Sequence, residues 1–109
     1  MRVSAIQKDL LFVLFAIEAR GAAGPVPGVR LLKMINASRS AEVFPANFRA
    51  SCHTLVDHGL LQKYRSESLK LAFSLTDEGR KRAEAIYSAR VGDAVTCQKL
   101  VDISQFLIN

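Results

Sequence analysis

The stretch from residue 55 to residue 79 constrains the fold more than any other part of this 109-residue chain. A helical pattern ends at Gly59, and glycine is the residue type most favoured just after a helix. Two strand-like segments follow at 60–65 and 69–75, and the second alternates apolar and polar residues. Only three residues separate the segments, so they are expected to form an antiparallel hairpin. Thr76 then supplies a capping side chain for a further helix, which follows the hairpin without a linker.

The helix before this hairpin is predicted to begin at Pro45, because proline is favoured at the first helical position, and to end near His58. Four of its apolar residues are spaced as one buried face: Phe48, Cys52, Leu55 and Val56. The opposite side and the flanks are expected to face solvent, with Asn47, Arg49, Ala50, His53 and Thr54.

The N-terminal region predicts a long helix followed by a break. Ser4 and Gln7 have the spacing of a capping box, which opens a helix over about 5–20 that ends at Gly21. This helix is apolar over so much of its surface that it must be buried on more than one side, by the domain or by a second subunit. The Gly-Pro-Val-Pro-Gly sequence at 24–28 cannot be helical and predicts an extended connector with room for one short edge strand.

Residues 29–35 predict a short second helix, and its periodicity allows two inward faces. Either Val29, Leu32 and Ile35 or Leu31 and Ile35 face the core. Residues 36–42 are polar and are expected to form a turn or loop. The connection to Pro45 is therefore longer than the tight turn of the usual helix-turn-helix.

After Thr76, a fourth helix is predicted to reach about Arg90 and to turn Ala83, Ile86 and Tyr87 inward. Asp93 can cap a last helix to about Leu107, unless Gly92 is only a bend in one long helix. The residues at 91–109 form a wide apolar stripe, and together with the first helix they exceed what a small core needs. We therefore expect a homodimer, with 91–109 as the dimerisation element.

Composition restricts the function classes. A chain of this length predicts a single domain, 1–109, with its core at about 5–90. The net charge is +5, and the segment from Arg20 to Lys70 holds eight basic and three acidic residues, an excess equal to the whole net charge. Such an excess favours an anionic partner such as nucleic acid or a membrane surface. Cys52 and Cys97 have no CxxC spacing and are expected to be buried free thiols in a reducing cytoplasm.

The segment from Leu55 to Ile86 resembles bacterial and archaeal winged helix-turn-helix regulators of the MarR and PadR kind. The resemblance rests on LVDHGLLQKYR, followed by SLKLAFSLTDEGRKRAEAI. It implies a mainly α fold with a small β-hairpin (α+β), in which flanking N- and C-terminal helices surround a winged helix-turn-helix. The implied activity is sequence-specific binding of double-stranded DNA, in a repressor-like transcriptional regulator.

The resemblance also implies how DNA would be contacted. The helix at 45–58 would enter the major groove, with base contacts from Asn47, Arg49, Ala50 and His53. The hairpin at 60–75 would act as a wing on the DNA backbone. The cations expected to contact phosphate are Lys63, Arg65, Lys70, Arg39 and Lys33.

The same residues allow other functions besides transcriptional regulation. A winged helix can also serve as a protein–protein adaptor, or bind DNA for plasmid replication, partition or transfer. The chain lacks the residue patterns of nucleophilic or acid–base catalysis, so no enzyme is expected. His58 lies six residues after Cys52, which is a net rotation of about 240° around their helix, so the two cannot chelate one metal. No cofactor or membrane span is expected either, and the sequence does not indicate whether a small-molecule effector exists.

Overall fold

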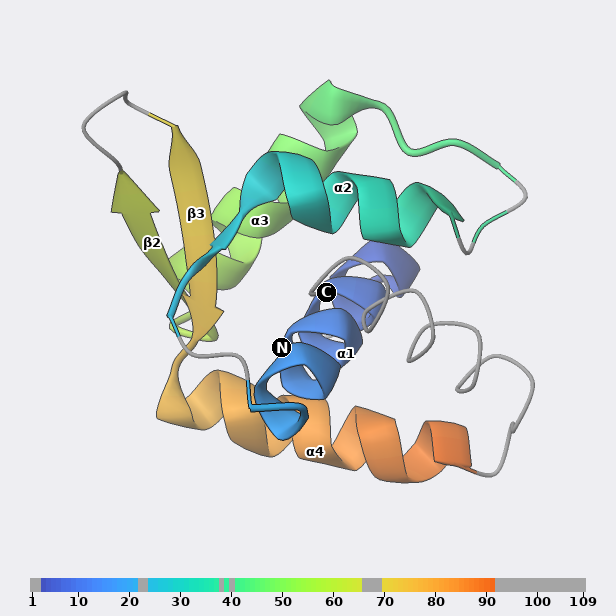
Figure 1. Cartoon of the computed structure of the whole chain (residues 1–109), viewed down its shortest axis with the longest axis vertical. Coiled ribbons are helices and arrows are strands. Elements are labelled where there is room, and N and C mark those ends of the chain that lie inside the picture. The colour runs from blue at the N-terminus through green and yellow to red at the C-terminus, as the bar shows by residue number, and fades with distance from the viewer. Residues whose placement is uncertain (1–2, 22–23, 38, 40, 66–69, 92–109) are drawn as a thin grey trace.

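The computed structural model describes residues 3–21, 24–37, 39, 41–65 and 70–91. In chain order their elements are α1 (Ala5–Ala19), β1 (Val26–Pro27), α2 (Gly28–Ala37), α3 (Pro45–Asp57), β2 (Leu61–Arg65), β3 (Leu71–Leu75) and α4 (Asp77–Val91) (Figure 1). The described part is mainly helical with one small antiparallel sheet, which confirms the predicted α+β class and its winged-helix-like order. The last helix predicted from Asp93 lies outside the described residues.

Helix α1 forms the centre of the core. It begins at the predicted capping box, in which the Ser4 hydroxyl accepts from the Gln7 amide and the Gln7 side chain accepts from the Ser4 amide. Its apolar residues are almost fully buried against the other helices and β3: Leu10, Leu11, Phe12, Val13, Leu14, Ala16 and Ile17. The breadth of its apolar surface is therefore explained within one chain, and the expectation of a homodimer gains no support from α1.

The sheet has the order β1-β3-β2, with β3 paired antiparallel on both sides. The predicted edge strand is present, and Pro27 lies in it opposite Ala72. An edge strand tolerates proline because it forms ladder hydrogen bonds on one side only. The predicted hairpin is also present, with Leu61 opposite Leu75 and Arg65 opposite Leu71. Both strands begin slightly later than predicted.

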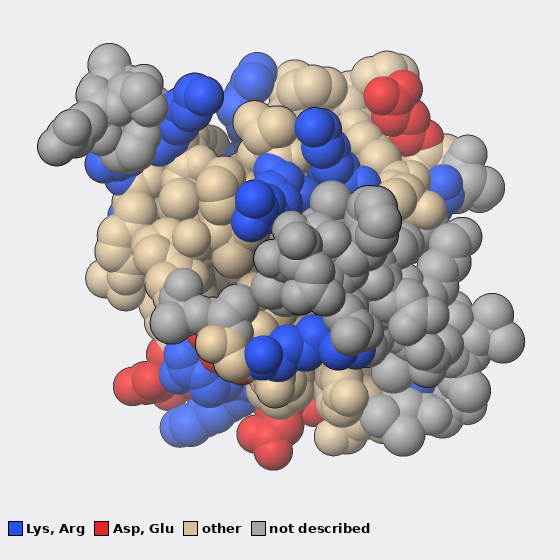
Figure 2. All heavy atoms as spheres, viewed as in Figure 1, with Lys and Arg blue, Asp and Glu red and all other residues tan. Residues whose placement is uncertain are grey.

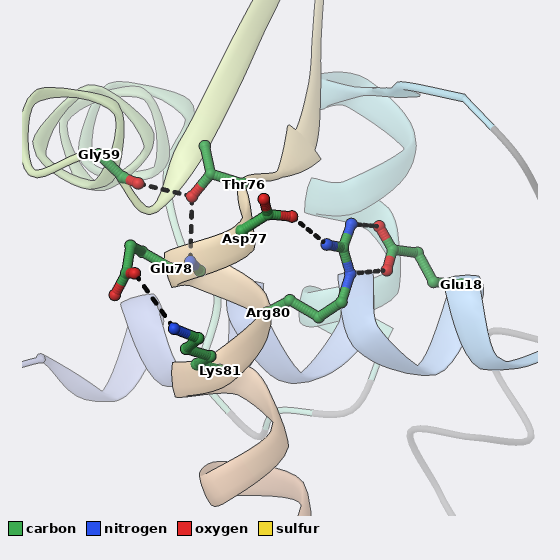
Figure 3. Close-up of polar contacts among 8 residues, drawn as sticks. Glu18, Gly59, Thr76, Asp77, Glu78, Arg80 and Lys81 are labelled. Atoms are coloured by element: carbon green, nitrogen blue, oxygen red, sulfur yellow. Dashed lines mark hydrogen bonds and ion pairs between the residues drawn. The ribbon is translucent and has the colours of Figure 1, made fainter.

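A tight junction joins the end of α3, the hairpin and the start of α4 (Figure 3). Gly59 has a φ of 74°, as predicted for the residue that turns the chain out of α3. The Thr76 hydroxyl donates to the Gly59 carbonyl oxygen at 2.5 Å and accepts from the amide of Gly79 at 3.0 Å. One side chain therefore closes α3 and caps α4, which gives a physical reason for the spacing between glycine, threonine and glycine in this part of the sequence.

Helices α1 and α4 are joined by an ion pair and by aromatic packing. The Arg80 guanidinium donates to both carboxylate oxygens of Glu18, at 2.9 and 3.1 Å (Figure 3). The Tyr87 ring lies 5.5 Å from that of Phe12 and 5.2 Å from that of Phe15, between ring centroids. As predicted, Ala83 is buried, and Ile86 and Tyr87 pack against the core.

Helix α2 settles the choice between its two possible inward faces. Leu31 and Ile35 are fully buried, whereas Val29 is 68% exposed. The prediction that Val29 faces the core is therefore wrong, and the alternative with Leu31 and Ile35 is confirmed. Gly28 explains this rotation, because a Cβ on it would lie 3.4 Å from the Phe73 ring and 3.7 Å from the Phe48 ring. The start of α2 thus lies close to β3 and α3, and Val29 is turned outward. Among the described residues, no helix is long and apolar enough to cross a membrane.

Candidate nucleic-acid interface

Helix α3 has one buried and one exposed face. Phe48, Cys52 and Leu55 point into the core, as predicted, and Val56 is partly buried. At about 100° per residue, the middle of the opposite face is formed by Ala46, Ala50 and His53, which are all exposed. Two of these three residues are alanines, so the backbone of α3 can approach a partner closely over its first two turns.

The two strongest candidates for base contacts lie on opposite flanks of this face. Asn47 and Arg49 are both exposed and are separated by about 160° around the helix axis. They therefore cannot contact the same base, and each would meet a different edge of a groove that held α3. The Thr54 hydroxyl donates to the Ala50 carbonyl oxygen at 3.0 Å, so this hydroxyl's proton is used within the helix.

The hairpin presents cations on the side of the sheet that faces the helices. Lys63 is opposite Phe73 and Arg65 is opposite Leu71, and residues directly opposite in an antiparallel pair share a face. Phe73 is a core residue, so this face is the one on which α3 packs. Lys63 and Arg65 are exposed because β2 extends past the core. Lys70 is exposed just before β3, and the hairpin loop at 66–69 lies outside the described residues.

Helix α2 adds two exposed cations, Arg30 and Lys33. Figure 2 shows Lys and Arg side chains over the upper half of the view, around α2 and the hairpin, and a second group in the lower half, where acidic side chains lie beside them. Most acidic side chains visible in that view lie at the lower edge, where Figure 1 has α4. Lys33 was predicted as a phosphate contact and is exposed here, whereas Arg30 was counted in the charge excess but not proposed as a contact.

Arg39 differs from the other predicted contacts. Its guanidinium donates to an oxygen of Asp9 on α1 at 2.5 Å, and Arg90 of α4 donates to the other oxygen at 2.7 Å. The connection between α2 and α3 reaches the side of the molecule opposite the hairpin (Figure 1). The structure therefore gives Arg39 a role in joining this connection to α1, and does not group it with Lys63 and Arg65.

The described basic residues include one group with acidic partners and one group without. Four basic residues around α1 and α4 have acidic partners: Arg39, Arg80, Lys81 and Arg90. Seven exposed basic side chains form no hydrogen bond or ion pair within the described part of the chain: Lys8 and Arg20 on or next to α1, Arg30 and Lys33 on α2, Arg49 on α3, and Lys63 and Arg65 on β2. Most of the basic residues left without a partner, five of these seven, therefore lie on α2, α3 and β2.

The far end of α3 has the opposite charge. Asp57 is the last residue of α3, is exposed, and lies on the same face as Ala50, because seven residues are close to two full turns. A carboxylate there would repel phosphate. An anionic partner is therefore favoured over the N-terminal half of α3, where the unpaired backbone amides also carry partial positive charge.

The described side chains include no metal-binding cluster and one buried thiol. Within the residues that the structure describes, no three His, Cys, Asp or Glu side chains gather closely enough to hold a metal ion. Cys52 is a buried free thiol, as predicted, and burial raises its pKa from 9.0 to about 12. It is therefore uncharged and a poor nucleophile at neutral pH. Cys97 lies outside the described residues.

Phe44 and Val29 are exposed apolar residues that the sequence did not single out as candidate contacts. Phe44 directly precedes α3 and is 67% exposed, and Val29 is exposed at the start of α2. Periodicity could not single out Phe44, since one apolar residue in a loop has no repeat to compare with.

Comparison of the chain with protein-family models, with curated proteins and with solved structures finds no match.

Proposed function

We propose that this protein binds double-stranded DNA in a sequence-specific manner, as a winged-helix transcriptional regulator of the MarR-like kind. Helix α3 would lie in the major groove, and the β2–β3 hairpin would contact the DNA backbone beside it. One observation carries the proposal. Five of the seven exposed basic residues without an acidic partner lie on α3 and on α2 and β2, whereas Arg80 and Lys81 on α4 are paired with acids.

Two physical features of α3 support this proposal. Cations that are not neutralised within the protein can release the counterions of DNA when they meet phosphate, which drives binding. Ala46 and Ala50 leave room for a base edge against the helix, and Asn47 and Arg49 supply hydrogen-bonding side chains on either side. Asparagine suits adenine and arginine suits guanine in the major groove.

A homodimer stays part of the proposal, because operators read by such domains are commonly two-fold symmetric. The residues expected to form the dimer contact, at 91–109, lie almost entirely outside the described part of the chain. Light scattering on the protein at micromolar concentration tests this point, and a monomer would count against it.

The experiment is an anisotropy titration of random-sequence duplex DNA at 50 and 200 mM salt, with Lys63→Gln compared to Lys81→Gln. Both variants remove one exposed lysine charge, but Lys81 is paired with Glu78 on α4. The wild-type protein should bind more weakly at high salt. Lys63→Gln should lower the slope of log affinity against log salt by about 1. Lys81→Gln should leave it unchanged. No binding to any duplex at low salt would exclude a DNA-binding function.

A protein–protein adaptor is the second candidate, and the exposure of Val29 favours it. An apolar side chain that is 68% exposed suits the buried centre of a protein interface, which is more apolar than its rim. The same titration separates the two functions. An adaptor that uses this surface would show no salt-dependent affinity for DNA.

A further inference from the structure

Phe44 is the large aromatic side chain that the described part of the fold leaves most exposed, and it lies at the start of α3. It is 67% exposed, whereas its neighbour Val43 is 4% exposed and belongs to the core. The next residue, Pro45, is the first of α3. Phe44 therefore lies between a buried residue, Val43, and the first residue of α3, and these two neighbours fix the position of its exposed ring.

The backbone at Phe44 is held in place by a clamp. The side-chain amide of Asn36 accepts from the backbone N–H of Val43 at 2.8 Å and donates to the Val43 carbonyl oxygen at 3.3 Å. Proline fixes its own φ and favours extended backbone in the residue before it, and Phe44 is extended, with φ −77° and ψ 150°. The long connection between α2 and α3 thus ends in an ordered segment that presents an aromatic ring to solvent.

Stability does not explain a phenylalanine at this position. Phe44 is the N-cap residue of α3, and no side chain caps the first turn. Serine, threonine, aspartate or asparagine there would bond a free amide of that turn, and phenylalanine cannot. The ring also gains little from burial because two thirds of it is exposed. The position therefore gives up both the capping bond and the apolar burial that other choices would supply.

We infer that Phe44 contacts the C5 methyl group of a thymine in the major groove and thereby sets sequence preference. The inference rests on the proposed function, in which the N-terminal end of α3 is nearest the bases. The C5 methyl is the apolar group that the major groove displays, and phenylalanine is one of the side chains suited to it. Phe44 directly precedes α3, and the exposed cations Arg49 on α3 and Arg30 and Lys33 on α2 have no acidic partner, so DNA is the occupant that fits the charge of these two helices.

The test removes the methyl group and the ring separately. A DNA site is first selected in vitro with the wild-type protein, and each thymine in it is then replaced in turn by deoxyuridine, which lacks only the C5 methyl. At one thymine, the wild-type protein should lose about fourfold in affinity, as expected for one buried methyl group. Phe44→Ala should bind the selected site more weakly but show no further loss with deoxyuridine at that position.

Val29→Ala is the matched control, because it also removes an exposed apolar side chain. It should retain the full wild-type sensitivity to deoxyuridine. Phe44→Ala should keep the wild-type unfolding midpoint in urea and the wild-type salt dependence on random DNA, so that loss of folding is excluded. A selected site without thymine, no deoxyuridine effect, or an equal effect in Phe44→Ala would each overturn the inference. If the wild-type protein bound no duplex, the proposed function itself would fail.

Discussion

The carbonyl oxygen of Leu60 lies 1.8 Å from the position that a Cβ atom on Gly79 would occupy. No side chain fits at that distance, and the obstacle is backbone, which cannot rotate away. Leu60 is fixed in turn, because its amide donates to the Leu55 carbonyl oxygen and its own carbonyl accepts from the amide of Thr76. The close approach of α4 to the start of the hairpin therefore requires glycine at residue 79.

Gly79→Ala should consequently lower the free energy of unfolding by more than about 3 kcal/mol, since α4 must move away from the hairpin to admit the methyl group. Urea unfolding followed by circular dichroism measures this. Gly21→Ala is the control, because Gly21 has a φ of 88° but open space where a Cβ would be. Its cost should be limited to the left-handed backbone, about 1–2 kcal/mol. Equal costs in the two variants would contradict the steric explanation.

This junction also shows why much of the fold could be predicted from sequence. Glycine favours the left-handed backbone that ends a helix, and threonine favours the position that caps the start of one. The positions of Gly59 and Thr76 therefore predicted where α3 ends and α4 begins. The strand alternation around Phe73 predicted the buried side of the hairpin. These are local signals, and the structure confirms them.

What the sequence could not supply is the set of contacts between distant residues. Arg39 was expected to contact phosphate, since a basic residue in a polar loop gives no sign of its partner. The structure pairs it with Asp9, thirty positions earlier. The outward turn of Val29 follows from the closeness of Gly28 to Phe73, which periodicity within α2 does not report. The grouping of Lys63 with Arg49 as DNA contacts was expected from the resemblance, and their lack of acidic partners emerges only from the fold.

Asp9 accepts from two arginines, so its loss should cost more than the loss of either. Asp9→Asn removes the negative charge and leaves Arg39 and Arg90 close together, with Arg90 only 20% exposed. We expect a loss of about 2–3 kcal/mol in the free energy of unfolding. Arg39→Gln should cost about 1 kcal/mol or less, because Arg90 still neutralises Asp9. Urea denaturation of both variants checks the order, and a larger effect of Arg39→Gln would be inconsistent with a shared carboxylate.

Burial of Cys52 should make stability fall as the pH rises above 9. Its pKa is raised from 9.0 to about 12, so the folded chain keeps the thiol proton while the unfolded chain loses it. Because the folded state then binds more protons, the free energy of unfolding decreases between these values, by up to about 1.4 kcal/mol per pH unit. The same burial should prevent a thiol reagent from reacting with the native protein at pH 8.

The measurement compares urea unfolding at pH 8 and pH 10.5 for Cys97→Ser and for the double variant that also carries Cys52→Ala. Other groups titrate over this range in both proteins, so the difference between the two pH dependences isolates Cys52. Identical pH dependences would show that the buried thiol does not contribute. Rapid labelling of Cys52 in the native Cys97→Ser protein would likewise contradict its burial.

Arg49→Ala should change sequence preference rather than general affinity for DNA. On a selected site, the loss of a bidentate contact to guanine should cost about 1–3 kcal/mol, and the preference at one base pair should relax. On random duplex DNA, the affinity should fall only by the contribution of one positive charge. Asn47→Ala should relax the preference at a different base pair, because the two side chains lie about 160° apart around α3. Selection with each variant reports the positions directly. If Arg49→Ala weakened binding equally on selected and random DNA, Arg49 would be a phosphate contact, and the flank of α3 that bears it would face the DNA backbone.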